Sequence, residues 1–221
     1  MPLLVDLDVV WRNLDYVLAG ALSTVRLSLV ALLFALTLGA LAGIARLYAP
    51  QPIRALSVGY IELFRGTPVL VQMFFVFFGL PLVLGWNISA FIAAMLALTL
   101  NSGAYFAEIT RGGLQSIPGG QWMAGLASGL SRRQVLRWII IPQAIRRVVA
   151  PAVGQFTILV KDTSIASVIG FFELTKAGQH VIERTFASFE ILALVGVMYF
   201  LVCYSGSALS RRLEAQFGGA S

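Results

Sequence analysis

The chain has 221 residues, of which 58% are hydrophobic and only 12% are charged, and its mean hydropathy is +0.86. A soluble domain is about 45–50% apolar and about 25% charged, and a soluble protein of 23.9 kDa has too much surface to hide this apolar surplus. The composition therefore excludes a soluble domain and predicts an all-α integral membrane protein. Membrane proteins concentrate basic residues in their cytoplasmic segments, which accounts for the net charge of +6 without nucleic-acid binding.

The first predicted element is a short amphipathic helix on the membrane surface. Apolar residues recur with a helical period through Met1–Leu18, and aspartates lie among them. A helix needs about 20 mostly apolar residues to span a bilayer. Five later segments have this length, namely residues 19–46, 57–82, 86–107, 138–161 and 187–209.

Basic residues predict the orientation of these five spans, because cytoplasmic segments are enriched in them. With the N-terminus outside, ten basic residues lie in inward segments: Arg46, Arg54, Arg111, Arg132, Arg133, Arg137, Arg146, Arg147, Arg211 and Arg212. Three lie in outward segments: Arg12, Lys176 and Arg184. We therefore expect the N-terminus outside and the C-terminus in the cytoplasm.

The second span carries polar residues and a proline. Arg65 and Gln72 are seven residues apart and share a helix face. They either face a solute or, in the case of Arg65, extend from the cytoplasmic end of the span toward water. Proline lacks a backbone donor and clashes with the preceding helical turn, so Thr67–Pro68 predicts a kink.

The third span ends in a polar stripe. Asn101, Tyr105 and Glu108 are spaced i, i+4 and i+7 and therefore lie on one helix face, which should point to the protein interior. Two interpretations remain open. The stripe contacts a solute, or Asn101 and Tyr105 form hydrogen bonds between helices while Glu108 pairs with Arg111 or Arg65.

The long inward loop predicts a short helix. Residues 120–130 are rich in Gly, Ala and Ser, with Trp122, Leu126 and Leu130 at helical spacing, and we expect the helix to end at Ser131. A helix of small residues allows close approach to a partner's cleft. A helix that rests on lipid headgroups would have a similar composition.

A lysine and an aspartate lie side by side in the fourth apolar segment. A charge at the bilayer centre costs about 2.5–3.5 kcal/mol, so Lys161 and Asp162 should face protein or water. A neutralising ion pair is one explanation, but adjacent helix residues do not face each other. A helix broken at Thr163 and Ser164 fits better, because the new helix start would direct its N–H groups at an anionic ligand.

The reactive residues are few. Cys203 lies in an apolar run, and His180 lies in an outward connection, where we expect it on the surface. This pair does not predict a zinc site or a Cys–His nucleophile. The sequence also lacks a G-x-x-x-x-G-K-[ST] phosphate loop, so we expect no ATP hydrolysis by this chain.

The inward loop follows a known register. The signature reads Glu-Ala-Ala, three residues, Gly, nine residues, Ile, one residue and Leu-Pro. In this chain its positions hold Met123-Ala124-Gly125, Gly129, Ile139 and Ile141-Pro142. The chain thus resembles the permease subunits of bacterial ATP-binding-cassette importers of the polar amino acid group. It departs from that pattern at Met123 in place of glutamate, Gly125 in place of alanine and Ile141 in place of leucine.

Four further segments extend the resemblance over nearly the whole chain: ELFRGTPVLVQMFFVFFGLP (62–81), NSGAYFAEITRGGLQSIPGGQ (101–121), IPQAIRRVVAPAVGQF (141–156) and KDTSIASVIGFFELTKAG (161–178). The resemblance implies a type I importer permease fold with a short cytoplasmic coupling helix. It also implies an N-terminal segment at 1–18, a transmembrane domain at 19–210 with a coupling loop at about 112–137, and a cytoplasmic tail at 211–221.

The resemblance implies partners as well. Two permeases, either identical copies or this chain with a sister, form the path in the bacterial inner membrane, surrounded by lipid. Two ATPase subunits, which carry the ATP and magnesium, grip the coupling helix, and an extracytoplasmic binding protein delivers an amino acid. No cofactor is expected on this chain. The implied coupling residues are Gly120, Trp122, Met123, Ala124, Gly125, Leu126, Gly129 and Leu130. The predicted solute-contacting residues are Lys161, Asp162, Thr163 and Ser164, with Glu108, Gln72, Asn101 and Arg65 nearby.

Two other functions are alternatives to an importer. A stand-alone carrier or channel driven by a gradient would need no ATPase and leaves the Gly/Ala-rich loop unexplained. A membrane-embedded enzyme would need a nucleophile with a base, or a metal cluster, within the spans, and the sequence predicts neither.

Overall fold

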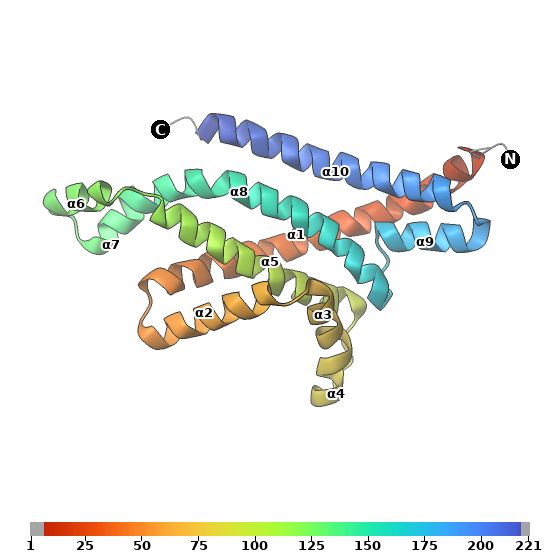
Figure 1. Ribbon diagram of the computed structural model, residues 1–221, viewed down its shortest axis with the longest axis horizontal. Coiled ribbons are helices and arrows are strands. Elements are labelled where there is room, and N and C mark those ends of the chain that lie inside the picture. The colour runs from red at the N-terminus through yellow and green to blue at the C-terminus, as the bar shows by residue number, and fades with distance from the viewer. Residues whose placement is uncertain (1–6, 218–221) are drawn as a thin grey trace. The chain divides into compact units, whose positions relative to one another are not determined.

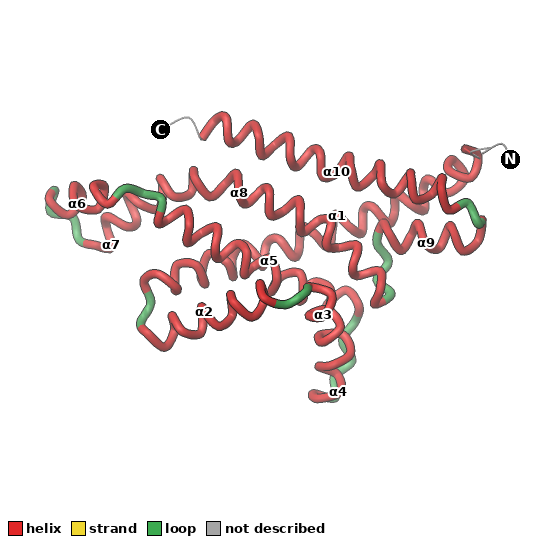
Figure 2. The backbone as a smooth tube through the Cα atoms, in the orientation of Figure 1, coloured by secondary structure: helices red, strands yellow, loops and turns green. Residues whose placement is uncertain are grey.

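The computed structural model describes residues 7–217, with side chains for residues 7–208 and Arg212. The described part consists of helices joined by short loops (Figure 1) and contains no strand (Figure 2), which confirms the predicted all-α class. In chain order the helices are α1 (Leu7–Tyr48), α2 (Gln51–Gly66), α3 (Val69–Phe74), η1 (Phe75–Gly79), α4 (Leu80–Leu84), α5 (Ala90–Gln115), α6 (Gly119–Ala127), α7 (Arg132–Val135), η2 (Leu136–Ile140), α8 (Ile141–Asp162), η3 (Thr163–Ile169), α9 (Leu174–Thr185) and α10 (Ser188–Phe217).

Four helical runs among the described residues are long and apolar enough to cross a membrane: α1, α5, the run Arg132–Ile169, and Ser188–Ala208 of α10. A fifth span results if α2 and Val69–Leu84 are counted together, since a break at Thr67 and Pro68 separates them. Pro68 is extended, with ψ of 136°, at the start of α3. The predicted kink at Thr67–Pro68 is therefore confirmed.

The predicted amphipathic helix and the first predicted span form one element. The part of Met1–Leu18 that the structure describes is helical from Leu7, and the helix continues to Tyr48 without a break. At about 1.5 Å per residue, α1 is about 60 Å long, roughly twice the hydrocarbon thickness of a bilayer. It therefore extends well beyond a membrane core.

The sequence patterns did not predict α9. Its first turn is capped by Glu173, and it places His180 against α1, where the imidazole Nδ1 lies 2.9 Å from the Tyr16 hydroxyl. His180 was expected on the surface, and this contact leaves it half-buried there.

The chain forms two compact units, each with its own core. The first unit comprises Met1–Leu33, Thr67–Thr99 and Thr157–Ser205, and the second comprises Phe34–Gly66, Leu100–Phe156 and Gly206–Ser221. Four helices are divided between the two units, with one segment in each: α1, α5, α8 and α10.

Two apolar clusters form the core of the first unit. One joins α1, α3, α5, α8 and η3 through Leu27, Ala31, Met73, Ala97, Leu159 and Ala166. The other joins α1, α9 and α10, and Figure 1 shows α9 beside the start of α10. A Cβ atom added at Gly178 of α9 would lie only 2.7 Å from Val195 Cγ2 of α10, so these two helices pack very closely.

The second unit depends on a similar close approach between α1 and α5. A Cβ atom added at Gly39 would lie 2.4 Å from the Cβ of Phe106 and 2.8 Å from the carbonyl oxygen of Gly103. Small residues at such contacts let two membrane helices gain van der Waals packing along their backbones.

This packing predicts that Gly39→Ala destabilises the protein. The added methyl group would meet Cβ and backbone atoms that cannot rotate away, and overpacking of this kind costs about 1–3 kcal/mol. We expect a lower melting temperature of the purified protein. The matched control is Gly59→Ala in α2, where nothing lies within 4 Å of the added atom and alanine favours the helix. Equal melting of Gly39→Ala and wild type would contradict the close packing.

Candidate functional site

The segment Lys161–Ser164 lies where α8 changes into a tighter helix. Asp162 is the last residue of α8 and has helical φ and ψ of −66° and −18°, and Thr163 begins η3, a 3₁₀ helix. No non-helical residue separates the two helices. The predicted start of a new helix with exposed N–H groups is therefore wrong, and the irregularity is a tightening of one continuous helix.

Hydroxyl groups accompany this tightening. Thr163 Oγ1 donates to the Val160 carbonyl, Ser164 Oγ to the Lys161 carbonyl and Ser167 Oγ to the Ser164 carbonyl, each at 2.7 Å. Each bond reaches a carbonyl three residues earlier, where the change in helix type disturbs the regular ladder. The predicted competition of Thr163 and Ser164 for backbone hydrogen bonds is confirmed.

The two charges of the segment differ in exposure. The Lys161 side chain is exposed and that of Asp162 is half-buried. Neither charged group forms a hydrogen bond or an ion pair within 4.0 Å with any residue in the described range 7–217. The alternative of a close Lys161–Asp162 ion pair is thus not seen, and the segment presents one positive and one negative group side by side.

Gln72 belongs to the same unit and stabilises the break before α3. Its Nε2 atom donates to the Thr67 carbonyl at 3.0 Å and to Thr67 Oγ1 at 2.8 Å. Gln72 is buried. The amide therefore bonds to backbone and side chain at the point where Pro68 interrupts the helix.

In the second unit, three arginines surround Glu108. Arg111 donates to Glu108 Oε2 at 3.0 Å from Nε and 2.7 Å from a terminal nitrogen, Arg46 donates to Oε1, and Arg65 lies 3.8 Å from Oε2. Glu62 lies 3.8 Å from Arg46 at the edge of the group. The predicted pairing of Glu108 with Arg111 and Arg65 is confirmed. The sequence did not indicate that Arg46 and Glu62 join this cluster, because each is a single charged residue near a helix end.

Asn101 and Tyr105 also connect α5 to α2. Asn101 Nδ2 donates to the Phe64 carbonyl at 2.9 Å, and the Arg65 guanidinium lies 5.3 Å from the centre of the Tyr105 ring. The hydrogen-bonding alternative for Asn101 is confirmed. The structure thus brings Asn101, Glu108 and Arg65 together in the second unit, whereas Gln72 and Lys161–Ser164 belong to the first.

The predicted coupling helix is α6, and it is shorter than expected. It ends at Ala127, because Gly129 adopts a left-handed conformation with φ of 82°, as glycine commonly does after a helix. Gly129 and Leu130 therefore lie in a turn. Ser131 does not end α6 but begins α7, where it forms a capping box with Gln134.

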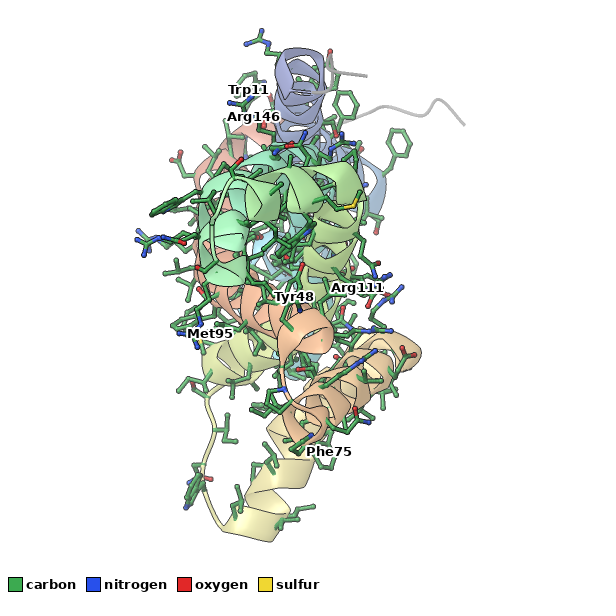
Figure 3. All side chains as sticks on the ribbon, turned by 90° about the vertical axis from the view of Figure 1, so that its left-hand side faces the viewer. Trp11, Tyr48, Phe75, Met95, Arg111 and Arg146 are labelled. Carbon is green, nitrogen blue, oxygen red and sulfur yellow. The ribbon has the colours of Figure 1, made fainter. Side chains whose placement is uncertain are left out.

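Two sides of α6 differ sharply. Gly125 is buried, and a Cβ atom there would lie 2.8 Å from Val135 Cγ2 and 2.9 Å from Ile139 Cδ1, which explains glycine at this register position. The Trp122 ring lies 6.4 Å from that of Tyr48, which Figure 3 labels. Met123 is 69% exposed, and Gly120, Ala124 and Leu126 are exposed as well. The helix packs through Gly125 on one side and exposes both small and large apolar residues on the other.

The comparisons with known proteins agree with this arrangement. Residues 35–218 match the family described as "Binding-protein-dependent transport system inner membrane component". The glutamine transport system permease protein GlnP of Escherichia coli is 40% identical over 210 residues, which cover 95% of this chain and 96% of the relative. The L-cystine transport system permease protein TcyB of Bacillus subtilis is 32% identical over 94% of this chain and 89% of its own.

Solved structures extend the agreement to three dimensions. A crystal structure of an amino acid ABC transporter with histidines aligns with a TM-score of 0.91 at 32% identity, over 96% of this chain and 99% of that one. An inward-facing structure of the MetNI methionine ABC transporter aligns with a TM-score of 0.72 at 19% identity, over 90% and 96%, and supports the fold alone. On the family match and the 40% identity along almost its full length, this chain belongs to the binding-protein-dependent transport system inner membrane component family.

Proposed function

We propose that this chain is the permease subunit of an ATP-driven amino acid importer in a bacterial inner membrane, with its N-terminus outside and its C-terminus in the cytoplasm. The family membership and the glutamine transport function of a relative such as GlnP of Escherichia coli support the importer. The ten-to-three distribution of basic residues supports the orientation.

The pair Lys161 and Asp162 carries the proposal for the solute. These adjacent, oppositely charged groups have no ion-pair partner in the described part of the chain. A free amino acid carries one carboxylate and one ammonium group close together. In our proposal Lys161 binds the carboxylate and Asp162 the ammonium, while the hydroxyls of Thr163 and Ser164 keep the tightened helix in shape.

The same reasoning favours an amino acid with an uncharged side chain. Glu108 and Arg65 are engaged in the ion pairs of the second unit, so they offer no obvious partner for an additional solute charge. Glutamine is uncharged in its side chain, and relatives in Escherichia coli and Bacillus subtilis are described as glutamine permeases. Direct contact of the solute with Gln72, Asn101, Glu108 or Arg65 stays a prediction.

Energy would enter through α6, which we propose as the docking element for a separate ATPase subunit. Its exposed Gly120, Met123 and Ala124 allow close approach, while Gly125 holds it tightly on Val135 and Ile139. The run from α7 through η2 continues into α8, which ends at Asp162. A movement of α6 would therefore reach the solute segment along one helix and switch the path between inward- and outward-facing states, with a second permease and a binding protein completing the importer.

The first test of this function is Asp162→Asn in proteoliposomes that contain the complete complex and are supplied with labelled glutamine and ATP. Loss of a charged hydrogen bond costs about 1.5–3 kcal/mol, so we expect uptake at low solute concentration to fall about tenfold or more. Asp15→Asn, the same change at an exposed position of α1, is the control. Normal uptake by an assembled Asp162→Asn complex would contradict the solute-binding role.

The docking role of α6 predicts that Ala124→Trp weakens retention of the ATPase. A bulky side chain on the exposed face should cost about 1–3 kcal/mol of binding energy, or about tenfold or more in affinity. The measurement is the amount of ATPase that co-purifies with the tagged permease. Ala55→Trp, at an exposed alanine of α2, is the control and should retain the ATPase. Full retention by both variants would exclude this face as the docking surface.

A further inference from the structure

The helical run Arg132–Ile169 carries positive charge that the described part of the chain does not neutralise. The sequence has no aspartate or glutamate between Glu108 and Asp162. The run contains five exposed arginines without an ion-pair partner among the described residues: Arg132, Arg133, Arg137, Arg146 and Arg147. These guanidinium groups are therefore available to an anionic partner outside the described chain.

Packing within the second unit determines which side of the run faces outward. Ile140 and Ala144 are buried in a cluster that also contains Leu114 of α5. A Cβ atom added at Gly113 of α5 would lie only 2.3 Å from Cγ2 of Val148. The three residues of the run that make these contacts are spaced i, i+4 and i+8, so they lie on one helix face. That face packs against α5.

Another side of the run combines large apolar residues with arginine. Trp138 is 59% exposed and Ile145 is 55% exposed. Arg146, which Figure 3 labels, is exposed as well, and so is Arg147. Tryptophan is enriched at the boundary between lipid headgroups and acyl chains, and arginine extends its charged end from apolar surroundings toward polar groups. The composition of this side therefore suits a membrane interface.

The position along the helix places two of the arginines at the level of the headgroups. The run Arg132–Ile169 is long and apolar enough to cross a membrane. At about 1.5 Å per residue, residues 148–169 are about 33 Å long, which matches the hydrocarbon core of a bilayer at roughly 30 Å. Arg146 and Arg147 directly precede this stretch and thus lie where the hydrocarbon ends.

Charge alone would also suit an acidic surface of a protein partner. Two observations favour lipid at Arg146 and Arg147. The exposed Trp138 and Ile145 give this side a large apolar content, and the arginines adjoin the part of the run that spans the hydrocarbon. An acidic protein would fit better at the other end of the run, where α7 follows the turn after α6.

We propose that Arg146 and Arg147, with Trp138 and Ile145 beside them, form a binding surface for the headgroup of an anionic phospholipid. The guanidinium groups would donate to the phosphate oxygens, while the apolar side chains would contact the adjoining acyl chains. In the orientation proposed above, this lipid lies in the cytoplasmic leaflet. The inference goes beyond the proposed function, because lipid binding requires neither a solute nor ATP.

The test measures binding of labelled phosphatidylglycerol to the purified full-length protein in micelles of a neutral detergent at 0.15 M salt. A basic residue near an anionic surface contributes roughly fivefold to affinity. We therefore expect the double variant Arg146→Gln, Arg147→Gln to bind phosphatidylglycerol about tenfold more weakly or worse. Both side chains are exposed, so the melting temperature should stay at the wild-type value.

The chain offers a matched control at its other pair of adjacent exposed arginines. The double variant Arg132→Gln, Arg133→Gln removes the same charge about 20 Å farther along the run, which is more than two Debye lengths at about 0.15 M salt. It should bind phosphatidylglycerol within about twofold of wild type. Equal weakening by both pairs would indicate general attraction to positive charge and would overturn the proposal.

Competition identifies the source of the bound phosphate. Unlabelled phosphatidylglycerol should displace the labelled lipid, whereas phosphatidylcholine and inorganic phosphate at the same concentration should not. Displacement by inorganic phosphate would indicate a site for a soluble anion and would contradict a lipid surface. The double variant Arg146→Lys, Arg147→Lys retains the charge and should keep most of the binding.

A protein partner at the same arginines would give a different pattern. The double variant Arg146→Gln, Arg147→Gln would then bind phosphatidylglycerol as wild type does but lose the co-purifying ATPase, which would overturn the lipid assignment. Absence of ATP-driven uptake by the wild-type complex would refute the proposed function instead, and the lipid-binding result would stand independently.

Discussion

The constraint on which this structure depends is that lipid offers no hydrogen bonds to the peptide backbone. Every backbone N–H and C=O at membrane depth needs a partner within the protein, so the described spans are helical, and irregular backbone survives only with local compensation. At Thr67–Pro68 the compensation comes from the Gln72 amide. At the junction of α8 and η3 it comes from hydroxyls, among them Thr163 and Ser164, that bond to carbonyls three residues earlier.

The same low-polarity surroundings divide the charged residues into two groups. Glu108 is surrounded by three arginines from α1, α2 and α5, so its carboxylate is paired within the second unit. Lys161 and Asp162 form no such close pair among the described residues. Opposite charges without a close partner are costly at membrane depth, and under the proposed function a zwitterionic solute would pair with them.

Glycines allow close helix packing at two further contacts of the second unit. Gly39 brings α1 against α5, and Gly125 brings α6 against the run that leads into α8. Packed interiors have low compressibility, so under the proposed function a displacement of α6 would be transmitted into the run that leads to α8. In the first unit, the buried bond from Tyr199 to Glu173 joins α10 to the capped start of α9.

The sequence by itself determined the all-α class, the positions of the spans, the break at Pro68 and the polar face of α5, because hydropathy and helical period depend on neighbours along the chain. It also marked Gly120–Leu130 as a helix-bearing loop, although the backbone conformation of Gly129 moved the end of that helix. Only the tertiary structure decided that Glu108 pairs with Arg46, 62 residues away, and that Glu173 is a buried cap held by Tyr199. A charge or a hydroxyl shows its type in the sequence, but its partner is set by which helices pack together.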